Sequence, residues 1–210
     1  MSKTLVAGLF GLGLLALGGG AFAMPVQAKP EASPDGEPAP TPPEAPERPP
    51  VTFLQARYFT PGPVHRTINR IVIHITDGNA DSARKTAQYF ATMNDGRQAS
   101  AHYVCGPDGI YQCVKDNDIA WHAIGANQDS IGIENQARTP NERGPNDPGV
   151  PVSEENYLNT ASLVRWLCWQ YAIPMDREHI LGHNEVSQNH PDCPTGQWDW
   201  NHFMGVLNNA

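Results

Sequence analysis

The feature that most constrains this chain is a set of metal-binding side chains carried by segments far apart in the sequence. His74 lies near the end of a short apolar run, Ile71 to Thr76, whereas His183 and Cys193 lie far downstream. Imidazole and thiolate are the ligands that Zn²⁺ prefers, and three protein ligands with one open position are typical of a catalytic zinc. Each residue alone is also compatible with a core histidine or a disulfide cysteine. It is the combination that predicts a zinc site.

The beginning of the chain has the composition of an export signal. An almost wholly apolar run, 5–23, follows Lys3 and ends in Ala21-Phe22-Ala23, a pattern typical of signal-peptide cleavage. The alternative is an uncleaved anchor, because the run approaches the roughly 20 residues that span a bilayer. Its glycines and small final residues favour cleavage. We therefore expect a signal peptide at 1–23, export to the periplasm or the extracellular space, and no stable membrane insertion afterwards.

A spacer follows the expected cleavage site. Residues 24–52 are rich in Pro, Ala and Glu and contain few bulky apolar side chains, so they cannot bury enough surface to offset their ordering entropy. The net charge of −8 includes this acidic stretch and argues against a nucleic-acid partner, which calls for basic patches. The remaining residues, 53–210, have the length of one domain.

Strand-like and helical patterns alternate in this domain, which predicts an α/β fold with functional groups on loops at one rim of the sheet. Expected strands cover 70–75, 101–105, 110–114, 130–135 and 178–181, and expected helices cover 81–93 and 153–173. Period-two alternation places His74 on the face opposite Ile73, and Glu134 opposite Ile133. The stretch 138–152 is rich in Pro, Gly and Asn and predicts a long surface loop.

Four cysteines in an exported chain make disulfides possible. Cys105 and Cys113 flank the turn signal Pro107-Asp108-Gly109, so they either pair across a hairpin or remain thiols. Cys168 lies in a helical pattern and is expected to be a buried thiol.

An ordered set of motifs carries a family resemblance. The runs Ser100-Ala101-His102-Tyr103, Pro107-Asp108-Gly109, Ala120-Trp121-His122-Ala123 and Ser130-Ile131-Gly132-Ile133-Glu134 resemble the type 2 N-acetylmuramoyl-L-alanine amidases. That superfamily includes AmpD-like enzymes, phage endolysins and peptidoglycan recognition proteins. The resemblance implies a single domain with a central mixed β-sheet flanked by helices and a zinc groove on one face. It also implies a zinc amidase acting on peptidoglycan or muropeptides, and we expect a monomer.

The resemblance assigns roles to individual residues. His74, His183 and Cys193 correspond to the three zinc ligands, and Glu134 matches the glutamate that acts on the metal-bound water in AmpD-like members. Phage members use a tyrosine where this chain has Ala101, which favours Glu134 as the general base.

Two further sets of residues are candidates for the site. Many family enzymes have a lysine, thought to stabilise the oxyanion, where this chain has Pro191, so the neighbouring His190 is the candidate replacement. Trp121 and His122 either line a substrate groove or pack a loop, and Asn127 is a candidate substrate contact.

Three other interpretations are open to test. Binding-only members of the superfamily typically lack the cysteine ligand, whereas Cys193 is present here. In a disulfide-bonded domain without metal, Cys193 would pair with another cysteine. A peptidase of the His-Glu-x-x-His type is disfavoured because that motif is missing.

Overall fold

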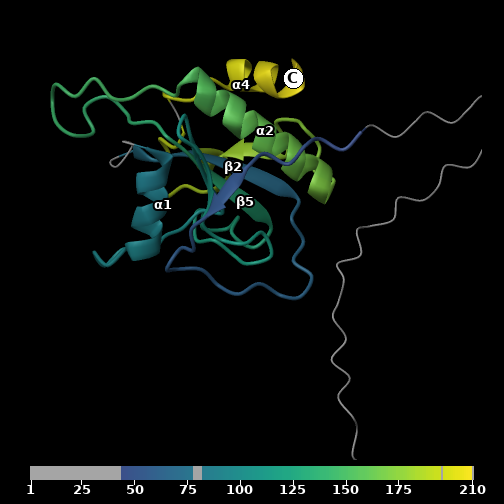
Figure 1. Cartoon of the computed structure of the whole chain (residues 1–210). Helices are drawn as coiled ribbons and strands as arrows, with labels where there is room; N and C mark the ends of the chain where they lie inside the picture. Colours follow the sequence, from purple (N-terminus) through teal and green to yellow (C-terminus); the bar gives the residue numbers. More distant parts are fainter. Residues whose placement is uncertain (1–43, 78–81, 195, 210) are drawn as a thin grey trace, which may run out of the picture. The chain divides into compact units, whose positions relative to one another are not determined.

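The strand that carries His74 lies inside a six-stranded sheet of order β1-β4-β3-β5-β2-β6 (Figure 1). The computed structural model describes residues 44–77, 82–194 and 196–209. The strands are β1 (Val51–Phe53), β2 (Arg70–Ile75), β3 (Tyr103–Gly106), β4 (Gly109–Gln112), β5 (Ser130–Asn135) and β6 (Ile180–Gly182). The helices are α1 (Ala83–Thr92), α2 (Glu154–Tyr171), α3 (His183–Val186) and α4 (Trp200–Asn209).

The sheet is mixed, as the α/β expectation and the resemblance imply. β3 and β4 form an antiparallel hairpin, whereas β3, β5, β2 and β6 are neighbours that run parallel to one another. The carboxyl ends of β2, β5 and β6 therefore lie at the same edge of the sheet, which is where polar groups that follow parallel strands meet.

Helices cover both faces of the sheet. α2 and α4 pack on one face, and Figure 1 shows them together on one side of β2. Ile73 and Ile133 point into this core, with Phe203 from α4. α1 covers part of the other face. The alternation predicted for β2 is confirmed, since Val72, the neighbour of Ile73, belongs to a separate cluster on the opposite face.

Local signals explain where α2 begins and ends. The Ser153 side chain accepts a hydrogen bond from the Asn156 amide, which satisfies one of the donors at the helix start. The last turn closes on Ala172 in the left-handed conformation, two residues before Pro174. The predicted helix is confirmed. The first predicted helix is confirmed over Ala83–Thr92, capped by Ser82, whereas 78–81 lie outside the described residues.

The hairpin is tighter than expected, and this separates the two cysteines. Gly106 pairs with Gly109, so the turn is only Pro107-Asp108, and Cys105 lies opposite Ile110. Cys113 lies one residue beyond the end of β4. The suggested Cys105–Cys113 disulfide is therefore wrong, and both are buried free thiols. Burial raises the pKa of each to about 12. Cys168 is also a buried free thiol, as expected.

The compact unit begins at Glu44. β1 pairs in parallel with β4, and the Arg48 guanidinium lies 4.6 Å from the centroid of the Trp166 ring on α2. Residues 44–52, expected in the linker, thus belong to the folded unit. The expected signal peptide and the linker before residue 44 lie outside the described residues. Within the described part of the chain, no helix has both the length and the apolar character needed to span a bilayer.

Candidate metal centre

His74 and Glu134 lie side by side on neighbouring strands. The parallel register of β2 and β5 pairs His74 directly with Glu134. Both side chains leave the sheet on the face opposite the α2 core, because Ile73 and Ile133 fill that core. His74 is only 2% exposed.

His183 reaches the same place from the adjoining strand. β6 pairs with β2 so that Gly182 lies beside Ile73, and His183 follows as the first residue of α3. The His74 and His183 ring centroids are 4.6 Å apart. Gly182 permits the close approach of Asn184 and Pro194 to this strand end, since a Cβ there would lie 2.6 Å from Asn184 Oδ1 and 2.8 Å from Pro194 Cδ.

Cys193 comes from the loop after α3. Its carbonyl oxygen accepts a hydrogen bond of 2.8 Å from the Asn184 amide, and its own amide donates to the His190 carbonyl at 3.3 Å. These contacts fix the loop against α3 and leave Cys193 Sγ 3.8 Å from His74 Nδ1.

The three side chains form a compact cluster. One potential ligand atom from each of His74, His183 and Cys193 lies within 4.8 Å of the other two. Burial, together with neighbouring histidines, holds the pKa of His74 well below its ordinary value, and burial also lowers that of His183. Both rings are therefore neutral at neutral pH, as metal ligation requires.

The chemistry of the cluster fits zinc. Burial, with Glu134 as a smaller contribution, raises the pKa of the Cys193 thiol far above its ordinary value. A thiolate in this position therefore needs a cation beside it, and a bound Zn²⁺ would provide one. Two neutral imidazoles and one thiolate form a donor set that zinc accepts with a fourth position open.

Glu134 is the carboxylate beside this cluster. Its Oε2 is buried and has no hydrogen-bond partner within the described part of the chain. Burial, with a contribution from Asp77, raises the pKa of Glu134 to about 8. A buried oxygen without a partner is costly in a resting protein and marks a place for a ligand, a water or an ion.

His190 lies at the mouth of the cluster, between two hollows. Its ring centroid is 5.1 Å from that of His183, and its side chain is exposed. A cleft of about 580 Å³ is lined by residues that include His190, Glu134, Cys193 and Arg97. A second hollow of about 530 Å³ shares His190 with the cleft.

The second hollow contains all three residues suggested to contact substrate, Trp121, His122 and Asn127. Trp121 stacks on Tyr58. Asn127 has an internal role, because its Oδ1 accepts hydrogen bonds from the amides of His122 and Ala123, at 3.0 and 2.7 Å.

These geometries agree with the comparison to protein families. Residues 64–196 match the family model described as N-acetylmuramoyl-L-alanine amidase. The chain belongs to this family. The match covers both histidines and the cysteine of the cluster, as well as Glu134.

Relatives of this amidase family support the assignment. A protein of Bacillus licheniformis named probable N-acetylmuramoyl-L-alanine amidase is 28% identical over 153 residues, which are 66% of this chain and 40% of that protein. The chain thus matches only about two fifths of the length of this curated relative.

Solved structures share the fold. The catalytic domain of XlyA has a TM-score of 0.56 at 22% identity, and the match covers 75% of this chain and 98% of that chain. A selenomethionine derivative of AmpD has a TM-score of 0.59 at 20% identity, with 75% and 94% covered. AmiD from E. coli has a TM-score of 0.54 at 23% identity, with 66% and 57% covered. The amidase fold class inferred from sequence is thus confirmed.

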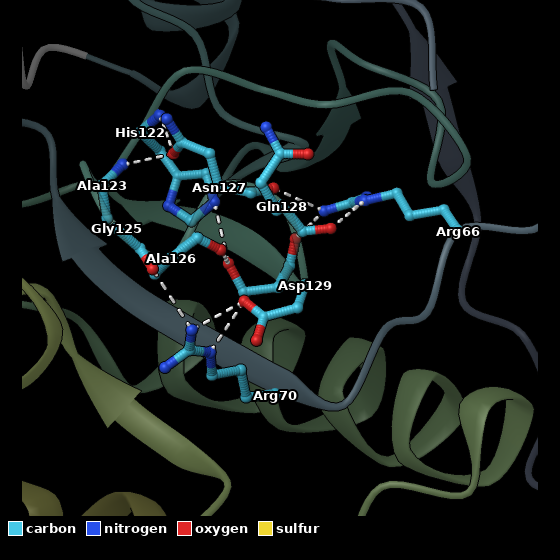
Figure 2. Close-up of polar contacts among 10 residues, drawn as sticks. Arg66, Arg70, His122, Ala123, Gly125, Ala126, Asn127, Gln128 and Asp129 are labelled. Atoms are coloured by element: carbon cyan, nitrogen blue, oxygen red, sulfur yellow. Dashed lines mark hydrogen bonds and ion pairs between the residues drawn. The ribbon is translucent and has the colours of Figure 1, made fainter. Parts of the chain in front are cut away.

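Two arginines that the sequence analysis did not single out hold the loop between His122 and Ser130. Figure 2 shows them approaching this loop from different sides. Arg66 donates to the Asn127 and Gln128 carbonyls at 2.9 and 3.1 Å. Arg70 pairs with Asp129 at 2.7 Å. No local motif announces these contacts, because they depend on packing between distant segments.

Proposed function

We propose that this protein is a zinc-dependent N-acetylmuramoyl-L-alanine amidase that cleaves the amide bond between the lactyl group of N-acetylmuramic acid and L-alanine. The observation that carries the proposal is the cluster of His74, His183 and Cys193 with Glu134 beside it. Family membership supports the bond class. A zinc ion in that cluster would supply Lewis-acid activation of water and of the scissile carbonyl.

Glu134 is the proposed general base. Its place in register with His74 puts it on the wall of the cleft beside the candidate ligands. A cation bound in the cluster would lower the pKa that burial raises, so that the ionised carboxylate is the acceptor for the proton of the attacking water. The same carboxyl group then donates that proton to the leaving amine of L-alanine, so that the chain returns to its initial protonation state. Ala101, which is buried and has no functional group, has no part in this step.

His190 is the proposed oxyanion donor. It is exposed at the mouth of the cluster and lines both hollows, whereas Pro191 has no side-chain donor. A ring N–H directed at the carbonyl oxygen would stabilise the negative charge that develops as water adds.

The proposed substrate is peptidoglycan or a muropeptide derived from it. The structural neighbour AmiD was solved with anhydro-N-acetylmuramic acid-L-Ala-D-gamma-Glu-L-Lys. Two hollows that meet at His190 give an amide substrate room on both sides of the scissile bond. We assign Trp121 and Asn127 to the wall of one side.

Export completes the proposal. A cell-wall substrate lies outside the cytoplasm, and the apolar run 5–23 with its Ala21-Phe22-Ala23 end has the pattern of a cleavable signal. A second cleavage pattern, Val26-Gln27-Ala28, follows a few residues later. Amino-terminal sequencing of exported protein tests the proposal: a first residue at 24 or 29 is expected, and an intact Met1 on membrane-embedded material would contradict it.

Mass analysis of products tests the activity. Purified peptidoglycan digested by the protein should release intact stem peptides that begin with L-alanine and leave glycan strands uncut. A chelator should abolish the release, and Zn²⁺ should restore it. Binding to peptidoglycan without release would favour a recognition module, and full activity in rigorously metal-free protein would contradict the zinc proposal.

A further inference from the structure

His122 contacts one of the proposed metal ligands directly. Its Nδ1 lies 3.0 Å from His74 Nε2, and the two rings meet edge to face with centroids 5.1 Å apart. The other nitrogen of His74, Nδ1, is the one 3.8 Å from Cys193 Sγ. His74 therefore has one ring nitrogen toward the metal cluster and the other toward His122.

The protons along these contacts follow by elimination. The Ser130 hydroxyl lies 2.5 Å from the Ala126 carbonyl oxygen, which only accepts, so its hydrogen is used there. His122 Nε2, 3.2 Å from Ser130 Oγ, must then be the donor of that pair. A neutral imidazole has one N–H, so His122 Nδ1 accepts from His74 Nε2–H. This leaves a lone pair on His74 Nδ1, which faces the cluster.

The His122 ring packs directly against the backbone of β5. A Cβ on Gly132 would lie 2.4 Å from His122 Cγ, so the ring requires glycine at that point of β5. The Gly132 backbone is held in turn by His102. The Gly132 amide donates to His102 Nδ1 at 3.0 Å, and the His102 amide donates to the Gly132 carbonyl at 3.0 Å.

We propose that His122 is a positioning residue that fixes the tautomer and the orientation of His74 so that Nδ1 faces the metal. The inference rests on the proposed function, in which His74 is a zinc ligand. Hydrogen-bond partners of metal-ligating histidines have this effect in general, and their loss typically weakens metal binding by about 10–100-fold. This role differs from that of a residue lining the substrate groove, whose replacement would change substrate binding and leave metal affinity unchanged.

The test is the zinc dissociation constant of the full chain, measured by competition with a chromogenic chelator. His122→Leu removes the acceptor at similar volume and should weaken zinc binding by about 10–100-fold. His122→Gln places its amide one bond too far and should behave like the leucine variant. His122→Asn keeps an oxygen near the place of Nδ1 and should stay within about threefold of wild type, because an acceptor for His74 Nε2–H is retained.

Two controls separate the inference from other effects. His202→Leu changes a surface histidine that pairs with Glu154 away from the cluster, and should leave zinc affinity unchanged. The visible spectrum of Co²⁺-loaded protein should shift in the leucine and glutamine variants and be restored in the asparagine variant.

The possible results distinguish a failure of the proposed function from a failure of the role of His122. Wild-type protein that binds no zinc contradicts the proposed function. Wild-type protein that binds zinc, with leucine and glutamine variants of equal affinity, contradicts only the role of His122. An asparagine variant as weak as the leucine variant also contradicts it, since the acceptor would then not be the property that matters.

Discussion

At the residue scale, Glu134 combines a buried oxygen without a partner and a position in register with His74. Replacing it with Gln keeps the shape of the side chain and removes the proposed base. We expect Glu134→Gln to retain zinc and the fold and to lose about 10²–10⁴-fold in turnover, the usual contribution of general base catalysis. Product release from peptidoglycan measures the turnover. The matched control is Glu155→Gln, because Glu155 is exposed in the first turn of α2. Near-wild-type turnover would mean that another group is the base.

His190 gives a second prediction at this scale. If its ring donates to the oxyanion, His190→Ala should lower turnover by about 10²–10³-fold, the scale for one lost oxyanion donor. Zinc content should not change, because His190 is outside the ligand cluster. His202→Ala is the control. A loss of only a few-fold would assign the oxyanion to the metal alone.

His102 gives a pH prediction for the metal-free protein. Burial, together with Arg66, lowers the pKa of His102 from 6.5 to about 3. Its Nδ1 accepts a hydrogen bond from the Gly132 amide. The unfolded chain binds a proton near pH 6.5, whereas the folded chain does not, so this contribution to stability is present above that pH and is lost between about 6.5 and 3.

The variant His102→Asn keeps an acceptor for Gly132 and removes the titration. Its deficit in unfolding free energy relative to wild type should therefore shrink by about 1.4 kcal/mol per pH unit below pH 6.5. Urea unfolding at several pH values measures the difference. A deficit that stays constant with pH would show that His102 is protonated in the folded state.

At the scale of elements, the sequence predicts those helices and strands that depend on local capping and on local apolar patterns. The capped, amphipathic α2 and the β-branched strands β2 and β5 were predicted with bounds close to those observed. α4 was missed, although Phe203 and Leu207 are spaced for one face and the Asp199 carboxylate accepts from the His202 amide at its start.

The candidate site also has a part that the sequence predicts and a part that it does not. The types and order of His74, His183 and Cys193 are visible in the sequence, and the structure brings them together. The contact between His122 and His74 is not visible, because it depends on how the loop before β5 folds back over Gly132. Such contacts arise from packing between distant segments, which periodicity does not encode.

Gly182 joins β6 to α3 and tests how that junction shapes the site. Gly182→Ala puts a Cβ 2.8 Å from Pro194 Cδ, so the Cys193 loop must shift. We expect weaker zinc binding and a lower melting temperature. Gly205→Ala is the matched control, because a Cβ at that position in α4 meets nothing within 4 Å. It should stabilise the protein by about 0.5–1 kcal/mol through helix propensity. A Gly182→Ala variant that binds zinc like wild type would mean that the loop adjusts freely.

At the scale of the whole molecule, the parallel arrangement explains why candidate ligands so far apart in the sequence meet. β2, β5 and β6 run parallel, so His74 and Glu134, near the ends of their strands, and His183, just after β6, share one edge of the sheet. Only Cys193 arrives from a loop. The α2 and α4 core packs on the face opposite the His74 and Glu134 side chains.

The last prediction concerns the residue at which the folded unit begins. The sequence pattern places the start of the domain at residue 53, whereas the compact unit begins at Glu44. Residues 44–53 add β1 to the edge of the sheet, and Arg48 packs over Trp166. A chain that begins at residue 44 should therefore unfold like one that begins at residue 24.

A chain that begins at residue 54 loses the β1 ladder and the Arg48 contact. We expect a loss of about 1–3 kcal/mol, from the few backbone hydrogen bonds and the cation–π contact removed. This corresponds to a melting temperature lower by about 2–4 °C per kcal/mol for a domain of this size. Zinc affinity should be unchanged, because β1 lies at the opposite edge of the sheet from β2 and β6. Equal melting temperatures for chains that begin at 44 and 54 would instead place the boundary at the end of β1.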